Sequence, residues 1–242
     1  MGSKNRIAKY IVPIIQSYID QNIITTYIEP FVGGANVIDK IHCETKIGSD
    51  DNKYLIALLK RVQSGLPLLD DVDRALYSKV RSEYKDGKFE DWYVGNVGFL
   101  ASYNGRWFDG GYAEAGYEKT KNGLRYRDYY QEAKRNILKQ GDDIKDITFT
   151  VKDYREYSNV SGAVIYCDPP YANTKKFANA INFNYEEFWE TVRKWSKNNI
   201  VLVSELSAPK DFSSLWEQSV SRSIKATDKS KAVEKLFIYK GI

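Results

Sequence analysis

Short apolar runs bounded by polar or turn-forming residues recur near both ends of the chain. Runs of this length that are rich in β-branched residues are typical of buried strands. They predict strands at residues 26–28, 46–48, 148–151, 163–165, 200–203 and 234–239. Apolar residues at helical spacing (Phe188, Val192 and Trp195) instead predict a helix over 183–198, and a further helix is expected to start near Tyr54.

The middle of the chain lacks this strand pattern. Residues 61–145 are rich in Tyr, Arg, Lys and Gly, with helical stretches near 73–84 and 128–139. We therefore expect an α/β catalytic domain formed by residues 1–60 and 146–242, into which residues 61–145 are inserted as a second, smaller domain.

The strand at 163–165 leads into the segment Tyr166-Cys167-Asp168-Pro169-Pro170-Tyr171. Neither proline has an N–H group to donate, and both have φ fixed near −65°, so the backbone leaving the strand is stiff and rich in acceptors. Asp168 adds a carboxylate that only accepts when ionised, and Tyr171 adds a flat aromatic ring. An Asp-Pro-Pro turn after a core strand is the purely structural alternative.

Such a cluster suits the exocyclic amine of a nucleobase. The Asp168 carboxylate and the Pro169 carbonyl can accept its two N–H groups, which favours a tetrahedral nitrogen and frees its lone pair for attack. Tyr171 can stack on the base, an interaction worth roughly 1–3 kcal/mol. A base inside a duplex cannot reach this cluster, so the target would have to be flipped out.

The strand at 26–28 is followed by Glu29-Pro30-Phe31-Val32-Gly33-Gly34-Ala35-Asn36. Its two glycines permit positive φ and close approach of a ligand to the backbone, but the spacing differs from the phosphate-binding G-x-G-x-x-G pattern. The next strand ends in Asp50 and Asp51. In a dinucleotide-binding fold an acid at this position holds a ribose hydroxyl, so we expect one of the two to bind ribose and the other to cap the following helix.

Together these motifs resemble the Dam-like DNA adenine N6-methyltransferases, which are DPPY-motif amino-methyltransferases of the α group. The resemblance runs from Gly2 to Tyr239 and implies a Rossmann-like, S-adenosylmethionine-dependent methyltransferase sheet. It implies that Asp168, Pro169, Pro170 and Tyr171 form the catalytic motif, with direct transfer and no covalent enzyme intermediate.

The resemblance also implies a set of residues that bind S-adenosylmethionine. The methionine-binding loop would be formed by Pro30, Phe31, Gly33, Gly34, Ala35 and Asn36. Asp50 would hold the ribose, Asp153 and Tyr154 would flank the adenine of the cofactor, and Lys4 would lie close to the methionine carboxylate or to Asp168. Family members usually carry an aromatic residue just before the Lys4 segment, whereas only Met1 precedes it here.

The segment 99–112 within the insertion interleaves aromatic residues with Asn and Arg, which suits nucleic acid. It resembles a shortened target-recognition domain in which Tyr103, Asn104, Arg106 and Trp107 are the candidate DNA contacts. Packing of Trp107 in the core is the alternative.

Two further segments carry basic residues. Residues 119–127 are expected to form a basic loop that either binds phosphate or is only solvated. Lys175 and Lys176, after the DPPY motif, are candidates for contacts with the backbone flanking a flipped base.

Composition narrows the function further. The net charge is +4, which permits phosphate binding without requiring it. Two cysteines indicate no disulfide framework, and a single histidine argues against a metal site and a histidine-based triad. We find no signal peptide or apolar run of membrane length, so we expect a cytoplasmic protein, either a monomer or a weak dimer.

The sequence thus predicts a site-specific methyltransferase that transfers a methyl group to N6 of a flipped-out adenine in double-stranded DNA. The same chemistry on cytosine N4 or on RNA remains an alternative, as does a non-catalytic DNA-binding relative. The recognition sequence, and whether the enzyme accompanies a restriction nuclease or belongs to a phage, stay open.

Overall fold

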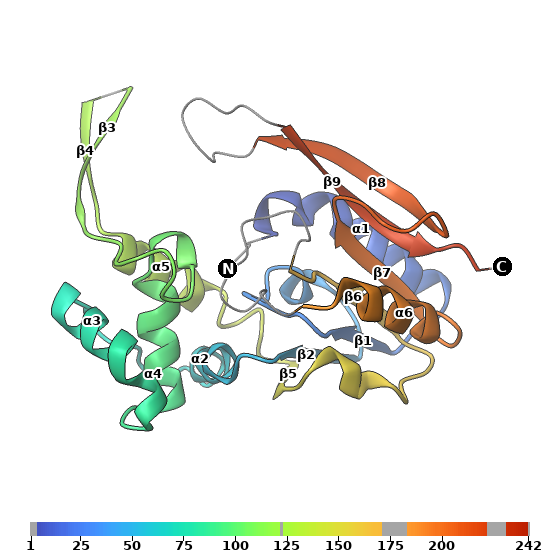
Figure 1. Ribbon diagram of the computed structural model, residues 1–242, viewed down its shortest axis with the longest axis horizontal. Helices are drawn as coiled ribbons and strands as arrows, with labels where there is room; N and C mark the ends of the chain where they lie inside the picture. Colours follow the sequence, from blue (N-terminus) through green and yellow to red (C-terminus); the bar gives the residue numbers. More distant parts are fainter. Residues whose placement is uncertain (1–3, 122, 171–182, 222–230, 242) are drawn as a thin grey trace.

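The computed structural model describes residues 4–121, 123–170, 183–221 and 231–241 (Figure 1). Its main sheet has seven strands in the order β5-β2-β1-β6-β7-β9-β8. In chain order these strands are β1 (Thr26–Glu29), β2 (Thr45–Asp50), β5 (Ile147–Val151), β6 (Val164–Cys167), β7 (Ile200–Glu205), β8 (Phe212–Ser221) and β9 (Lys231–Tyr239).

Five of these strands run parallel to one another, from β5 to β7. Strand β9 is antiparallel to both β7 and β8. The chain builds outward from β1 through β2 to β5 and then crosses to the other side of β1 to form β6. The strand order therefore reverses between β1 and β6, the position at which open α/β sheets place their ligands.

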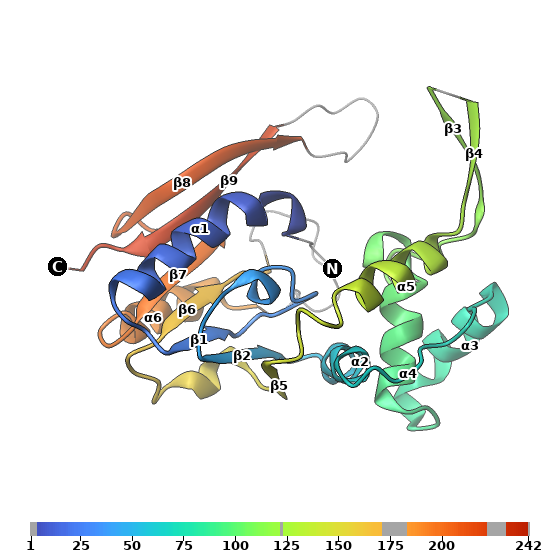
Figure 2. The ribbon, with the colours of Figure 1, turned by 180° about the vertical axis from the view of Figure 1, so that it is seen from behind.

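Helices cover both faces of the sheet (Figures 1 and 2). Helix α1 (Asn5–Gln21) buries Ile7, Ile11, Ile15 and Ile19 in a cluster that also contains Tyr27 and Tyr166 of the sheet. Helix α6 (Tyr185–Trp195) packs in a second cluster, against Ile28, Ile165 and Val203. Because neighbouring residues of a strand point to opposite faces, the two clusters form the two sides of one sheet.

Residues 61–145, the predicted insertion, are mainly helical and lie to one side of the main sheet (Figures 1 and 2). The insertion contains α3 (Arg74–Glu83), α4 (Asp91–Gly95), the π-helix η3 (Asn96–Leu100) and α5 (Tyr129–Lys139). Helix α2 (Lys53–Gln63) packs against both α4 and β5. One apolar cluster runs from the α1 face of the sheet into Tyr77, Val94 and Val97, so the two parts share a continuous core.

A two-stranded hairpin projects from the insertion, as both views show (Figures 1 and 2). It consists of β3 (Gly116–Thr120) and β4 (Gly123–Arg127), paired antiparallel. The expectation of a basic loop over 119–127 was therefore wrong. A signal was present in the sequence, because Leu124 and Tyr126 alternate with Arg125 and Arg127 directly after an Asn-Gly pair. Both faces of the hairpin are largely exposed, so no apolar run marks its strands.

The predicted strands of the main sheet and the helices near 73–84, 128–139 and 183–198 are confirmed. Helix α1 and strand β8 were not predicted. The capping prediction at α2 was wrong, because the Asn52 side chain accepts from the backbone N–H groups of Tyr54 and Leu55. Asp50 instead accepts from the N–H of Asn52 and so stabilises the turn before the helix.

Within the described part of the chain, every helix is too short or too polar to span a bilayer. The same residues contain no group of three or more His, Cys, Asp or Glu side chains arranged to hold a metal ion.

The junction between α2 and α4 gives a test of the packing. Gly95 lies so close to the Tyr54 carbonyl that a Cβ atom there would overlap it, whereas nothing lies near a Cβ built at Gly116. We expect Gly95→Ala to lower the free energy of unfolding by about 1–3 kcal/mol through overpacking. Gly116→Ala should change it by less than about 0.5 kcal/mol. Urea unfolding of both variants checks this, and equal stabilities would contradict the packing of α4 on α2.

Candidate active site

The parallel strands bring the predicted site segments to one edge of the sheet. The strands β5, β2, β1 and β6 are neighbours in that order. At or directly after their carboxyl ends lie Asp153, Asp50, Pro30 and Asp168 respectively. Segments separated by more than 100 residues in sequence therefore meet at the point where the strand order reverses.

Asp168 leaves β6 on the face covered by α1. Its Oδ1 lies 3.0 Å from Nζ of Lys4, which also lies 3.3 Å from Oε2 of Glu234 on β9. The side chains of Lys4, Asp168 and Glu234 are only 11%, 19% and 13% exposed. Of the two positions expected for Lys4, the structure shows the one beside Asp168.

Burial raises the pKa of Asp168 to about 6, although the ammonium group of Lys4 acts in the opposite direction. The negative charge of Glu234 adds to the rise. The carboxylate is therefore ionised at neutral pH but lies close to its protonation range.

Pro169 is buried and Pro170 is partly buried. The hydroxyl of Tyr185, at the start of α6, donates to the Pro170 carbonyl over 2.8 Å. This contact anchors the end of the motif to α6, and the sequence analysis missed it because the hydroxyl of a helical tyrosine gives no sign of its partner. Tyr171 lies outside the described residues.

The glycine loop after β1 is a tight turn held by β2. The N–H of Val32 donates to the Ser49 carbonyl over 2.8 Å. Gly33 and Ala35 have positive φ, at 49° and 55°, so the left-handed positions are not those of the two consecutive glycines. The turn continues through Asn36 into a single 3-10 turn, η1 (Ile38–Lys40).

The side chain of Gln140, just after α5, braces the same loop. Its Nε2 lies 3.2 Å from the Gly34 carbonyl oxygen and 2.9 Å from the Ala35 carbonyl oxygen. It also lies 2.9 Å from Oδ2 of Asp39. This bracing residue was not predicted, since it lies more than 100 residues from the loop in sequence.

Asp50 joins the glycine loop to β2. Its carboxylate accepts from the N–H of Gly33 at 3.3 Å and from the N–H of Asn52 at 3.0 Å. Burial raises its pKa to about 7, the backbone donors oppose this rise, and the neighbouring Asp51 adds to it. The arrangement leaves an enclosed acceptor at the end of β2, as a ribose site requires.

Phe31 and Tyr154 meet on the α6 face of the sheet. Their ring centroids are 5.2 Å apart, and Phe188 of α6 lies 5.9 Å from Phe31. Asp153 precedes Tyr154 and caps a 3-10 turn, while Arg155 donates two hydrogen bonds to its carboxylate. This ion pair lowers the pKa of Asp153.

Glu29, the last residue of β1, is a site candidate that the sequence analysis did not single out. It is buried, and the hydroxyl of Tyr27 donates to its Oε1 over 2.7 Å. Burial raises its pKa well above the usual range, and the charge of Asp168 contributes to this. Its position directly before Pro30 was the available signal.

The predicted DNA contacts of the insertion separate into two groups. Tyr103, Asn104 and Arg106 are exposed on a short loop closed by a bridge between Ser102 and Tyr112. Trp107 stacks on Tyr54 with ring centroids 5.2 Å apart and packs against the core. Trp107 therefore packs against the core, which was the alternative to a DNA contact. Lys175 and Lys176 lie outside the described residues.

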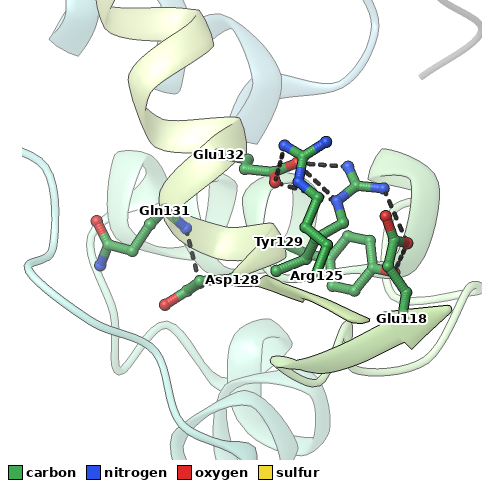
Figure 3. A network of polar contacts seen from close by, with 7 residues as sticks. Glu118, Arg125, Asp128, Tyr129, Gln131 and Glu132 are labelled. Atoms are coloured by element: carbon green, nitrogen blue, oxygen red, sulfur yellow. Dashed lines mark hydrogen bonds and ion pairs between the residues drawn. The ribbon is translucent and has the colours of Figure 1, made fainter. Parts of the chain in front are cut away.

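The hairpin is anchored to α5 by a network of ion pairs at its base (Figure 3). Arg127 donates to Glu132 through Nε at 3.0 Å and pairs with Glu118 at 3.4 Å. Arg125 extends from the same strand and lies 3.8 Å from Glu132. Tyr117, Leu124 and Tyr126 alternate with these charged residues along the hairpin, and their side chains are 73%, 72% and 56% exposed.

The strand order and the acidic groups at the carboxyl ends of the central strands define a Rossmann-like methyltransferase. Comparison with known proteins adds the family. Residues 1–236 match the family model of the D12 class N6 adenine-specific DNA methyltransferases, and the chain belongs to this family. It is therefore an S-adenosylmethionine-dependent enzyme that methylates adenine at N6 in DNA.

Other comparisons are more distant. The rRNA methyltransferase AviRa from Streptomyces viridochromogenes is 11% identical with a TM-score of 0.45, covering 98% of this chain and 84% of its own. The magnesium protoporphyrin IX methyltransferase ChlM from Synechocystis PCC 6803 is 11% identical with a TM-score of 0.37, covering 97% and 79%. Similarity at this level supports no conclusion about substrate. The curated proteins contain no significant match.

The residues present fit S-adenosylmethionine. This molecule carries a positive sulfonium and ammonium, a carboxylate and ribose hydroxyls. The edge of the sheet offers the enclosed carboxyl groups of Asp50, Asp168 and Glu29 as acceptors, with Lys4 as a cation. Burial raises the pKa of all three acids, so a cationic ligand would favour their ionised forms.

The raised pKa of Asp50 predicts a specific dependence of stability on pH. Its folded pKa of about 7 exceeds its ordinary value of 3.8, so the folded state retains a proton that the unfolded state has lost. The contribution of Asp50 to the free energy of unfolding is fully present below about pH 4, and it is lost as the pH rises through about 7. Asp50→Asn should therefore flatten the change in stability between these pH values. Urea unfolding across this range checks it, and an unchanged slope would contradict the burial of Asp50.

Proposed function

We propose that Asp168 and the Pro169 carbonyl hold the N6 amine of an adenine flipped out of double-stranded DNA. What supports this is the stiff, acceptor-rich end of β6, where an enclosed carboxylate lies beside Lys4 at the switch point of the sheet. S-adenosylmethionine supplies an electrophilic methyl group bound to a sulfonium sulfur. The Tyr185 hydroxyl on the Pro170 carbonyl restrains the motif while the amine is bound.

The two acceptors act on the nitrogen rather than on the ring. Accepting both N–H groups would draw the amine out of conjugation and leave its lone pair free to take the methyl group that the cofactor would supply. Positive charge that develops on nitrogen is stabilised by the ionised Asp168 carboxylate. The carboxylate also lies where it can accept the proton that N6 then loses.

We assign the binding of the cofactor to the same sheet edge. Pro30, Phe31, Gly33, Gly34, Ala35 and Asn36 would line its methionine part, and Lys4 would stay paired with Asp168 next to it. Asp50 would accept from the ribose hydroxyls. Tyr154 and Asp153 would contact its adenine. Arg155 donates twice to Oδ1 of Asp153 and once to Oδ2, so a second lone pair of Oδ2 would accept from the adenine amine. Tyr171 would stack on the flipped base.

The central experiment is incubation of the purified protein with unmethylated duplex DNA and S-adenosylmethionine, followed by nucleoside mass spectrometry. We expect N6-methyladenine from the wild type and a loss of about 10²-fold or more for Asp168→Asn, because the amide cannot carry the charge that stabilises the transition state. Asp142→Asn, at a side chain that is 87% exposed, is the matched control and should retain activity.

Other products would overturn parts of this proposal. N4-methylcytosine would keep the role of Asp168 and replace the substrate. Cofactor binding with no methylated base in DNA would point to RNA as the substrate. The absence of both a methylated product and cofactor binding would favour a non-catalytic DNA-binding relative.

We propose a DNA interface on the side of the insertion that carries the hairpin. The exposed Tyr103, Asn104 and Arg106 would contact bases and phosphates there, together with Lys175 and Lys176. The hairpin supports the same assignment, because it presents Tyr117, Leu124 and Tyr126 to solvent while ion pairs of the residues between them anchor it to α5. Exposed aromatic and apolar side chains of this kind stack on bases or wedge between base steps.

Truncation of a hairpin ring tests this interface. Tyr126→Ala should weaken binding to duplex DNA by about 5- to 100-fold, the loss expected from about 1–3 kcal/mol of stacking. The control is Tyr10→Ala, at a tyrosine on α1 that stacks on Trp216 and is 38% exposed. Fluorescence anisotropy at fixed salt measures both, and equal affinities would remove the hairpin from the interface.

A further inference from the structure

Lys4 lies between carboxylates from two strands that are not neighbours. Asp168 follows β6, Glu234 lies on β9, and β7 separates the two strands. Nζ of Lys4 is 3.0 Å from Asp168 and 3.3 Å from Glu234. The contact joins the start of α1 to a strand 230 residues later in the chain.

Glu234 points to the face of the sheet on which Asp168 acts. Leu236, two residues further along β9, is buried in the α1-side cluster together with Tyr166. Side chains two apart on a strand share a face, so Glu234 and Asp168, which is two residues beyond Tyr166, both point toward α1. At 13% exposure, Glu234 is more enclosed than the carboxylate of an ordinary surface ion pair.

We propose that Glu234 is a positioning residue that holds the Lys4 ammonium against Asp168, and so keeps the Asp168 carboxylate available to the substrate amine. The inference rests on the proposed function of Asp168. Glu234 acts through Lys4 and touches neither the substrate nor the methyl group.

Direct and indirect effects of Glu234 on Asp168 have opposite signs. As a nearby negative charge, Glu234 raises the pKa of Asp168. As an anchor for Lys4, it holds in place a cation that lowers the same pKa. Among the described residues, the charges that act on Asp168 are those of Lys4, just before α1, and Glu234 on β9. The charge of Asp168 acts in turn on Glu29 of β1 and on Tyr166 and Cys167 of β6. The direction in which the pKa of Asp168 changes when Glu234 is replaced therefore shows which of the two effects dominates.

The first measurement is a ¹³C NMR titration of the Asp168 carboxyl carbon, assigned by its absence in Asp168→Asn. In Glu234→Gln we expect the pKa to rise by about one unit, because a neutral amide holds the ammonium less firmly than a carboxylate does and the ammonium then loses part of its effect on Asp168. The acid limb of the methylation rate against pH should move upward by the same amount. An unchanged or lowered pKa would overturn the proposal and leave Glu234 as a nearby charge only.

Two further variants separate charge from geometry. Glu234→Asp keeps the charge on a shorter side chain that reaches less far toward Lys4. If Glu234 positions Lys4, the pKa of Asp168 should rise in this variant as it does in Glu234→Gln. If Glu234 acts only through its charge, the pKa of Asp168 should keep its wild-type value. Glu217→Gln is the matched control, since it breaks the 3.2 Å pair with Lys235 at the same edge of the sheet and should leave Asp168 unchanged.

A double-mutant cycle completes the test. Lys4→Met should raise the pKa of Asp168, and adding Glu234→Gln to it should give no further rise if Glu234 acts through Lys4. An additional rise of equal size would contradict the inference. Because the titration needs no catalysis, an inactive wild type would reject the proposed function, whereas an active enzyme whose Asp168 ignores Glu234 would reject only this inference.

Discussion

The ion pair between Lys4 and Asp168 is the constraint on which the arrangement of the site depends. A carboxylate enclosed at the end of a central strand loses much of its hydration, and its charged form persists only where other groups replace the water. Lys4 supplies that replacement from the residue just before α1, so the start of the helix fixes the reactive end of the motif while the helix covers the sheet. The ionisation of Asp168 therefore depends on the position of α1, because that position sets where the Lys4 ammonium lies.

The glycine loop is likewise held by a few polar contacts from distant parts of the chain. Asp50 accepts from the loop at Gly33, and Gln140 braces its carbonyls from beyond α5. The loop that would hold the cofactor is thus fixed by β2 on one side and by the insertion on the other. Since the apolar core also runs from the sheet into the insertion, the part that would read DNA and the part that would bind the cofactor are mechanically connected.

Much of the fold could be predicted from local patterns. Buried strands such as β6 and β7 are short runs of β-branched and apolar residues, and α6 presents Phe188, Val192 and Trp195 at helical spacing. The hairpin and the Asn52 cap escaped prediction for different reasons. An exposed hairpin lacks alternating burial, and three consecutive polar residues at 50–52 all satisfy the chemistry of a cap. Only the geometry of the turn decides among them.

The sequence by itself determined the order of the motifs, the chemical character of the Asp168 segment and the family to which the chain belongs, because these depend on residue types at short spacing. The tertiary structure alone decided that Lys4, Asp168 and Glu234 meet, that Gln140 supports the glycine loop and that Trp107 faces the core. Each of these contacts joins residues that are distant in the chain. The packing of parallel strands and covering helices sets such distances, and no local pattern encodes them.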